Sequence, residues 1–360
     1  MPSQLAGSLL AKLEEFQHSK VTPGGVISIT DRFGTPEIIS FGSTSYSGGS
    51  AVSPATVYDI ASLTKPLVTA AIAMKLVESG KIDLHTKVHE LTDTVSIPEQ
   101  ITTTHLLGHS AGYPAHIHFY ESLRKLPSRT DFAGELVKMA AETPLVTEPG
   151  QQTQYSDLGY IVLGHILEQV SAKPLHLLFN ELIATPLKMR KSLFPSKTSY
   201  SPTQQIAPTE DCQTRGLLTG EVHDENAHVA GGVAGHAGLF SDATDIDKFA
   251  RSLCDSLNDK PSLFNSEISK QFASSSAAPN TSWRLGWDTP SEIPGVSHAG
   301  DLWPKDGIGH LGFTGTSLWI DPPKGRWVIL LTNRVHPTRN NHGIKDLRRF
   351  VMDTIASALR

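Results

Sequence analysis

Apolar residues recur at helical spacing in several parts of the chain. The first 16 residues combine charged and apolar positions in the manner of an amphipathic helix. An Ala-rich apolar run from Leu63 to Val77 ends shortly before Gly80, which predicts a buried helix with a glycine C-cap. Further helices are predicted over residues 131–142, 156–171, 174–184, 243–257 and 343–359, separated by loops that contain Pro and Gly.

Strand patterns lie near the two ends of the chain. Residues 26–30 and 36–42 predict two short strands joined through the turn-forming segment 31–34. Because strands from both ends enclose a mostly helical middle, the pattern predicts an α+β fold. One antiparallel sheet is flanked by the terminal helices, and a helical lobe is inserted into it. The later strands are predicted over residues 282–288, 308–313, 316–321 and 326–333.

The length of the chain favours two lobes. One hydrophobic core usually stops growing at about 250–300 residues, and this chain has 360. We expect an α/β lobe formed by residues 1–60 together with 240–360, and a mainly helical lobe formed by residues 61–239. The active cleft is expected between them, because small-molecule sites favour such boundaries.

Composition excludes several classes of function. The 31 Lys and Arg against 36 Asp and Glu give a net charge of −5, without a basic run, so nucleic acid is not an expected partner. No window of about 20 residues is predominantly apolar, so no membrane span is expected. The amino terminus lacks the apolar stretch of a signal peptide, which predicts a cytoplasmic location. Cys212 and Cys254 match no disulfide framework and are expected to be reduced.

Ser62-Leu63-Thr64-Lys65 lies where the buried helix begins. Residues three apart share a helix face, so the Ser62 hydroxyl and the Lys65 amine can come within hydrogen-bond distance. Backbone N–H groups at a helix start add positive potential that stabilises an oxyanion. The same S-x-x-K spacing recurs at Ser122 and Lys125, but the charged stretch around that pair is typical of a solvated surface.

A second candidate nucleophile is Ser110. It lies in Gly108-His109-Ser110-Ala111-Gly112, which matches the G-x-S-x-G elbow of α/β-hydrolases. The elbow needs a strand before the serine and a helix after it. The preceding residues have helical character, and Tyr113-Pro114 follows, so this context is missing. Ser110 is therefore the weaker candidate.

The 16 histidines raise the alternative of a metal site. Neither an H-E-x-x-H motif nor the H-x-H-x-D-H string of dinuclear hydrolases is present. We therefore interpret the histidines as loop and surface residues and expect no metal. The densest group consists of His105, His109, His116 and His118.

Tyr155-Ser156-Asp157 follows a Pro-Gly loop and precedes an apolar helix. A tyrosine at such a junction can project into a cleft. A neighbouring ammonium such as that of Lys65 would lower the pKa of its phenol and make it a usable base. The alternative is a core tyrosine beside a helix N-cap, with Ser156 or Asp157 as the capping residue.

His310-Leu311-Gly312-Phe313 lies on a predicted late strand that contains a glycine. Glycine in a strand often marks a place where a ligand or another backbone comes close. If the strand lines the cleft, the backbone N–H of Phe313 can act as an oxyanion donor beside that of Ser62. The alternative is a β-bulge without catalytic meaning.

The three motifs, taken in this order, resemble the serine β-lactamase and penicillin-binding-protein superfamily. The likeness is closest to its class C β-lactamase-like branch, which shows S-x-x-K, Y-x-N and K-T-G or H-x-G in this order. It covers residues 20–340 and implies a β-lactamase/transpeptidase-like fold. It also assigns the G-H-S-A-G string to a structural loop. The supporting strings are H-L-L-G-H-S-A-G-Y-P, E-P-G-Q-Q-T-Q-Y-S-D-L-G-Y, A-G-L-F-S-D-A-T-D and R-L-G-W-D.

The resemblance implies a serine hydrolase that needs no metal or organic cofactor. Ser62 would attack a carbonyl to give an acyl-enzyme, and Lys65 and Tyr155 would move the proton. The backbone N–H groups of Ser62 and Phe313 would hold the oxyanion. The remaining substrate-binding residues would be Asp157, His310 and Gly312.

Two departures from the family pattern bear on the substrate. His310 stands where penicillin-recognising members carry Lys, and a neutral imidazole attracts a substrate carboxylate only weakly. Asp157 stands where many members carry Asn. A carboxylate there would stabilise protonated Lys65, so proton transfer shifts toward Tyr155.

The expected partner is a small amide or ester substrate. The Tyr-Ser-Asp form, with V-H-D-E-N-A-H at 222–228, resembles the branch that contains N-acetylmuramoyl-L-alanine amidases of muropeptide recycling. Hydrolysis of a muropeptide-type amide in a cell-wall fragment therefore ranks first, ester hydrolysis by a carboxylesterase second and β-lactam hydrolysis third. A non-catalytic sensor or binding module on the same fold is the alternative of another class.

Overall fold

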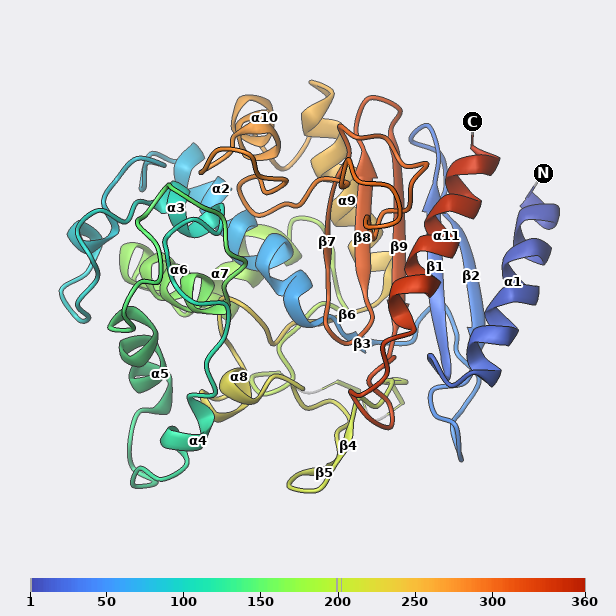
Figure 1. Cartoon of the computed structure of the whole chain (residues 1–360), viewed down its shortest axis with the longest axis horizontal. Helices are drawn as coiled ribbons and strands as arrows, with labels where there is room; N and C mark the ends of the chain where they lie inside the picture. The colour runs from blue at the N-terminus through green and yellow to red at the C-terminus, as the bar shows by residue number, and fades with distance from the viewer. Residues whose placement is uncertain (1, 199, 202, 360) are drawn as a thin grey trace.

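The computed structural model describes every residue except 1, 199, 202 and 360. Its centre is an antiparallel five-stranded sheet in the order β2-β1-β9-β8-β7 (Figure 1). The first and last parts of the chain therefore pair in one sheet, as predicted, with Ile27 opposite Leu330. The strands are β1 (Gly24–Thr30), β2 (Glu37–Gly42), β7 (Ile308–Leu311), β8 (Ser317–Asp321) and β9 (Arg326–Thr332).

Both faces of this sheet are covered, which explains why its central strands are apolar throughout. Alternate residues of a strand point to opposite faces. Val328 and Leu330 of β9 join the core under α1 (Pro2–His18) and α11 (Ile344–Ala358), whereas Trp327 and Ile329 join the larger core that includes α9 (Ala243–Leu257). Figure 1 shows the two terminal helices together on one face of the sheet.

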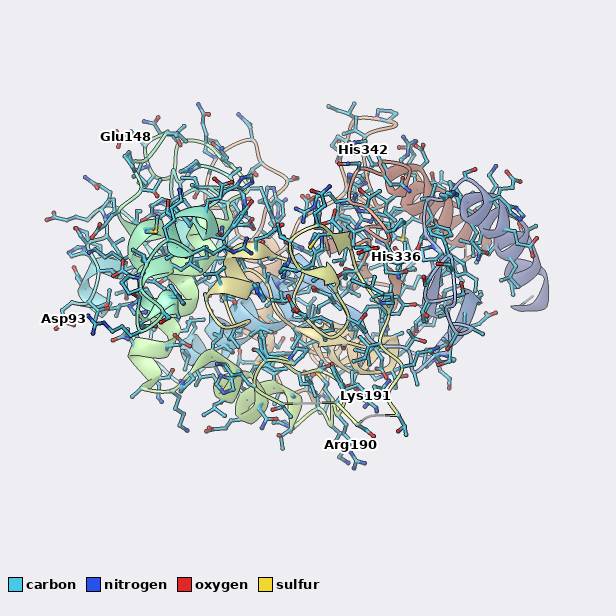
Figure 2. The ribbon with its side chains drawn as sticks, turned by 90° about the horizontal axis from the view of Figure 1, so that it is seen from below. Asp93, Glu148, Arg190, Lys191, His336 and His342 are labelled. Carbon is cyan, nitrogen blue, oxygen red and sulfur yellow. The ribbon has the colours of Figure 1, made fainter. Side chains whose placement is uncertain are left out.

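Helices supply most of the regular structure in the middle of the chain, although loops and turns make up more than half of residues 61–239. Figure 2 shows it from below, with Asp93 and Glu148 on the helical side and His342 nearer the sheet. Its apolar core is continuous with one face of the sheet, so the division into lobes at residues 60 and 240 remains a prediction. The remaining α-helices are α2 (Ala71–Glu78), α3 (Thr103–Leu107), α4 (Tyr120–Leu123), α5 (Phe132–Ala141), α6 (Asp157–Ser171), α7 (Leu175–Phe179), α8 (Glu225–Val229) and α10 (Ser266–Ser274).

One predicted strand is wrong. Residues 282–288 form bends and irregular backbone, with a single bridge from Asp288 to Gly309. Gly286 has a φ of +94°, and its N–H donates to the Leu107 carbonyl, so this segment packs on the helical region instead of extending the sheet. The sequence also gave no signal for two short pairings, β3 (Tyr58–Asp59) with β6 (Phe240–Ser241) and β4 (Asp211–Cys212) with β5 (Gly216–Leu217).

A buried carboxylate ties α9 to the sheet. Asp247 accepts hydrogen bonds from the Thr30 hydroxyl at 2.9 Å and from the Trp327 indole N–H at 2.7 Å. We expect Asp247→Leu to lower the free energy of unfolding by about 2–4 kcal/mol, because two buried donors lose their acceptor. Asp247→Asn keeps the acceptor oxygen and should cost clearly less in urea unfolding. Equal losses in the two variants would contradict this role.

Candidate active site

The predicted nucleophile lies on a tight turn. Ser62 belongs to a single 3₁₀ turn, η1 (Ala61–Leu63), and Lys65 begins a π-helical stretch, η2 (Lys65–Ala70), that leads into α2. The regular helix predicted from residue 63 therefore starts only at residue 71. Pro66 lies in the first turn of this stretch, where the missing N–H of a proline is tolerated. The turn still places Lys65 Nζ 3.1 Å from Ser62 Oγ.

The turn is held by a buried carboxylate of β3. Asp59 accepts the Ala61 N–H at 2.8 Å through one oxygen and the His223 N–H at 2.8 Å through the other. Ala61 has a φ of +48°, a left-handed conformation that is strained for a residue other than glycine. The Asp59 hydrogen bond stabilises this conformation immediately before Ser62.

The second motif meets the first at the start of α6. Ser156 is the N-cap of α6, and its hydroxyl accepts the Gly159 N–H, which confirms the capping alternative for that residue. Tyr155 precedes the cap, and Lys65 Nζ lies 4.8 Å from the centre of its ring. Asp157 Oδ1 lies 2.7 Å from Lys65 Nζ. Tyr155 and Asp157 therefore both face the Ser62–Lys65 pair.

The electrostatics make Lys65 an ammonium. Burial is the largest influence and lowers the pKa of Lys65, but Asp157 and Tyr155 together raise it by more, so the net shift is upward. Burial raises the pKa of Asp157, whereas the Lys65 ammonium and the hydrogen bond with His116 bring it well below its usual range. This agrees with the expectation that Asp157 stabilises protonated Lys65 and discourages it from acting as the base.

The expected pKa shift of Tyr155 is corrected. The sequence argument held that Lys65 would lower it. Burial, with the Asp157 charge, raises the pKa of the phenol by more than the charge of Lys65 and the hydrogen bonds with Lys65 and Ser62 lower it. The resting phenol is therefore protonated. One proton must leave the Lys65–Tyr155 pair before either group can accept the Ser62 proton.

Hydrogen bonds join the segment that follows His310, the third motif, to the turn that carries Ser62. The hydroxyls of Thr314 and Thr316 donate to the carbonyls of Asp59 and Ile60 at 2.7 and 3.1 Å. A Cβ on Gly312 would lie 2.4 Å from the Ile60 carbonyl oxygen, so only glycine allows this approach. Gly312 lies just beyond β7, and the predicted close approach is to a backbone.

Two backbone donors next to the serine are free. Within the part of the chain that the structure describes, the N–H groups of Ser62 and Phe313 have no hydrogen-bond acceptor. Each belongs to one of the two segments that the threonine hydroxyls join. A pair of unpaired N–H groups beside a nucleophile has the chemistry of an oxyanion hole.

His310 is a neutral imidazole. It is buried, and its Nδ1–H donates to the Leu311 carbonyl at 2.8 Å. Burial and the Lys65 charge lower its pKa to about 3. Its ring lies 6.0 Å from the Tyr155 ring and 5.4 Å from that of Trp283. The three predicted motifs therefore converge around one centre.

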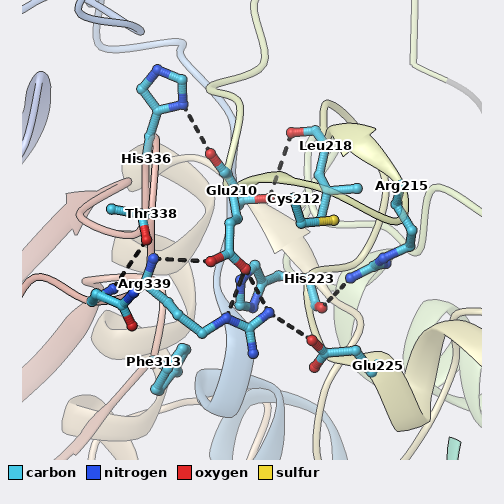
Figure 3. A network of polar contacts seen from close by, with 12 residues as sticks. Glu210, Cys212, Arg215, Leu218, His223, Glu225, Phe313, His336, Thr338 and Arg339 are labelled. Carbon is cyan, nitrogen blue, oxygen red and sulfur yellow. Dashed lines mark hydrogen bonds and ion pairs between the residues drawn. The ribbon is translucent and has the colours of Figure 1, made fainter. Parts of the chain in front are cut away.

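This centre opens into a cavity of about 700 Å³. Sequence reasoning missed its cationic wall, to which Arg334, Arg339 and Arg348 contribute. Figure 3 shows the part in which Arg339 pairs with Glu210 and with Glu225, at 2.7 and 2.6 Å. Phe313 stacks beside this network on the His223 ring.

Arg334 and Arg348, unlike Arg339, form no ion pair with a carboxylate among the described residues. Both are less than one-tenth exposed, and their guanidinium groups donate to backbone carbonyls, among them those of Phe313 and Gly312. No carboxylate among the described residues lies within ion-pair distance of either group. Arg348 had a local signal, since it lies on the apolar face of the helix that also carries Ile344 and Ile355.

Neither alternative serine lines the cavity that Ser62 faces. Ser110 is buried and donates to the Ala277 carbonyl at 3.0 Å. It follows the short helix α3, so the strand that an α/β-hydrolase elbow needs is absent there. Ser122 and Lys125 are exposed at the surface, as expected.

The histidines of the densest group make different contacts. His105 completes a capping box at the start of α3, and His109 Nδ1 accepts the Ser156 N–H. His116 instead contacts Asp157, with 2.9 Å between Nδ1 and Oδ2. Nothing in the sequence linked these two residues, which are 41 positions apart.

One group of potential metal ligands occurs among the described residues. His116, Asp157 and Asp224 bring ligand atoms within 4.8 Å of one another. However, the Asp157 oxygens already accept hydrogen bonds from Lys65 and His116, and Asp224 accepts one from His236 at 2.9 Å. Side-chain donors therefore contact both oxygens of Asp157 and one oxygen of Asp224.

Comparison with known proteins decides the family. The family model described as Beta-lactamase matches residues 9–352. The chain belongs to the beta-lactamase family. As a serine hydrolase of this family it has the predicted fold and the predicted class of chemistry. Among the described residues, no helix has the length and apolar character needed to cross a membrane.

Curated relatives of the chain carry different names. The chain is 33% identical over 304 residues to a putative D-alanyl-D-alanine carboxypeptidase of Escherichia coli K12, covering 78% of this chain and 70% of the relative. It is 30% identical over 303 residues to an N-acetylmuramyl-L-alanine amidase of Bacillus subtilis 168, covering 78% and 68%.

Solved structures agree on the beta-lactamase fold. EstCE1, a hydrolase with promiscuous acyltransferase activity, superposes with a TM-score of 0.75 at 20% identity, over 98% of this chain and 99% of the other. The octameric penicillin-binding protein homologue from Pyrococcus abyssi gives 0.75 at 22% identity, over 98% and 77%.

Proposed function

We propose that this enzyme cleaves a muropeptide-type amide through an acyl-enzyme on Ser62. The observation that carries the proposal is the convergence of the motifs. Lys65 Nζ lies 3.1 Å from Ser62 Oγ, 2.7 Å from Asp157 and 4.8 Å from the centre of the Tyr155 ring. A nucleophile, a cation and a phenol within contact of one another are the groups that acyl transfer needs.

The reaction begins once the Lys65–Tyr155 pair has lost one proton. Asp157 keeps the remaining charge on Lys65, so the phenolate of Tyr155 accepts the proton of Ser62 as Oγ attacks the carbonyl. The N–H groups of Ser62 and Phe313 stabilise the oxyanion. Tyr155 then protonates the leaving amine as the C–N bond breaks. Water hydrolyses the resulting ester by the reverse proton path.

The cationic wall supports a substrate that carries a carboxylate. His310 is neutral, as the sequence argument required, but Arg334 and Arg348 place two buried guanidinium groups in the same cavity. A buried charge is stabilised when an opposite charge pairs with it. The alanine carboxylate of N-acetylmuramoyl-L-alanine would supply that charge. The weak attraction expected of His310 for a substrate carboxylate would thus be supplemented by these two arginines.

The relatives support the same choice. One named relative is an N-acetylmuramyl-L-alanine amidase and another a putative D-alanyl-D-alanine carboxypeptidase, both names of enzymes that act on amides. A cytoplasmic location, as predicted from the sequence, would give the enzyme recycled wall fragments as substrates. Ester hydrolysis is the second candidate, because EstCE1 shares the fold.

The test compares kcat/KM for four substrates, because this ratio measures differential binding of the transition state. They are N-acetylmuramoyl-L-alanine, its C-terminal carboxamide, a short-chain p-nitrophenyl ester and a chromogenic cephalosporin. We expect the muramoyl-L-alanine to be cleaved fastest, and the carboxamide about 10–100-fold more slowly, because it lacks the charge-assisted contact. Fast ester or cephalosporin turnover without muramoyl-amide cleavage would refute the amidase. No acyl adduct by intact mass with any substrate would favour a binding module.

A further inference from the structure

We propose that His116 is a positioning residue that acts on Lys65 through Asp157 and makes the acylation of Ser62 depend on the charge of its own ring. The inference rests on the proposed role of Ser62 as the nucleophile. It assigns a function to a histidine that belongs to none of the three motifs.

The Asp157 carboxylate bridges two side chains. Oδ1 accepts from Lys65 Nζ at 2.7 Å and Oδ2 accepts from His116 Nδ1 at 2.9 Å. A carboxylate that pairs with an ammonium is ionised and cannot donate, so His116 Nδ1 carries the proton whether the ring is neutral or charged. The hydrogen bond therefore persists in both states, and titration at Nε2 changes only the charge.

His116 is held firmly against α6. The Asp157 N–H donates to the Ala115 carbonyl at 2.8 Å, and the Ser156 hydroxyl donates to the Pro114 carbonyl at 2.7 Å. On the other side of the histidine, the Asn226 side chain of α8 donates to the Ile117 carbonyl at 2.8 Å. These bonds fix the segment on both sides, so the contact between His116 and Asp157 does not depend on a mobile loop.

The bridge joins a buried group to an accessible one. The Lys65 side chain is fully buried, whereas that of His116 is 33% exposed and lines the cavity. Water can therefore exchange protons with His116 while Lys65 is shielded. Through the shared Asp157 carboxylate, the charge of His116 affects how tightly Lys65 holds its proton.

The groups around His116 favour its charged form. The hydrogen bond with Asp157 is the largest influence and raises the pKa of the imidazole above its ordinary value, against the effect of burial. Asp224 and Glu225 at the start of α8 also raise it. The other charged or titratable groups facing this cluster are His118, whose ring lies 5.2 Å from that of His116, His236, paired with Asp224, and Arg339, paired with Glu225.

The charge of His116 must weaken the hold of Lys65 on its proton. Two cations that share one carboxylate repel each other, so a protonated His116 makes proton loss from the Lys65–Tyr155 pair easier. Because activity needs that loss, the acylation rate rises about tenfold per pH unit in the neutral range. When His116 becomes neutral at higher pH, the Lys65–Tyr155 pair binds its proton more tightly. The acylation rate is then on the order of tenfold lower than the rise at lower pH would predict.

The test is the pH profile of acylation by a fluorophosphonate, followed by intact mass between pH 5.5 and 9 with EDTA present. The wild type should show a shoulder above pH 6.5, where His116 titrates. His116→Asn keeps an N–H donor for Asp157 without a titrating ring, so we expect a straight profile, about tenfold slower below the shoulder and similar above it. His116→Ala should be straight and slower at every pH. His118→Asn, the matched control, should keep the shoulder.

Each outcome decides the matter. A shoulder that persists in His116→Asn, that is lost in His118→Asn, or that is absent from the wild type overturns the proposal. An equal, pH-independent loss in the Asn and Ala variants would make His116 structural only and would also overturn it. Ser62→Ala separates this failure from that of the proposed function, because labelling of that variant would refute the nucleophile itself.

Discussion

Replacing Ser62 by Ala is expected to abolish acylation. The hydroxyl is the atom that Lys65 Nζ contacts at 3.1 Å, and alanine offers nothing that can form the ester. We expect turnover to fall by at least about a thousandfold. Covalent labelling by a fluorophosphonate, read by intact mass, should disappear. Thermal unfolding should change little, because the hydroxyl lies on a half-buried turn.

Ser110→Ala is the matched control. Its hydroxyl donates to the Ala277 carbonyl, so the variant should lose about 1 kcal/mol of stability while keeping both turnover and labelling. If Ser110→Ala abolished labelling while Ser62→Ala retained it, the nucleophile would be the serine of the G-H-S-A-G loop.

Replacing Lys65 by Met is expected to damage activity and stability together. Lys65 is fully buried, and its ammonium pairs with Asp157, whose side chain is 16% exposed. Removing one partner of a buried pair strands the other charge, which costs about 3–5 kcal/mol. We expect the lower end of that range, about 3 kcal/mol, because His116 continues to donate to Asp157. Acylation should fall by at least about a thousandfold.

The double variant Lys65→Met/Asp157→Leu separates the two effects. With both charges replaced by apolar groups, no buried charge remains, and stability should recover beyond that of the single variant. Activity should not recover. Urea unfolding measures the first property and phosphonate labelling the second. A double variant less stable than Lys65→Met would show that losing the hydrogen bond between His116 and Asp157 costs more than the stranded carboxylate does.

Local sequence patterns predicted the sheet and its covering helices well. The helix over 243–257 and the strands around 308–333 occur where the spacing placed them, because their amphipathic or apolar periods extend over several turns or residues. The same patterns predicted a strand over residues 282–288, which is wrong. Its aromatic and apolar residues are typical of a strand, but Gly286 adopts a positive φ and packs on the helical region.

The sequence by itself determined the order of the motifs and the departures at Asp157 and His310, because these depend on residue identity and short spacings. It also led to the prediction of Ser62 over Ser110. Only the tertiary structure decided how the groups act on one another. The bridge from Lys65 through Asp157 to His116 joins positions 92 and 41 residues apart. The raised pKa of Tyr155 follows from burial, a property of the packed core that no local pattern encodes.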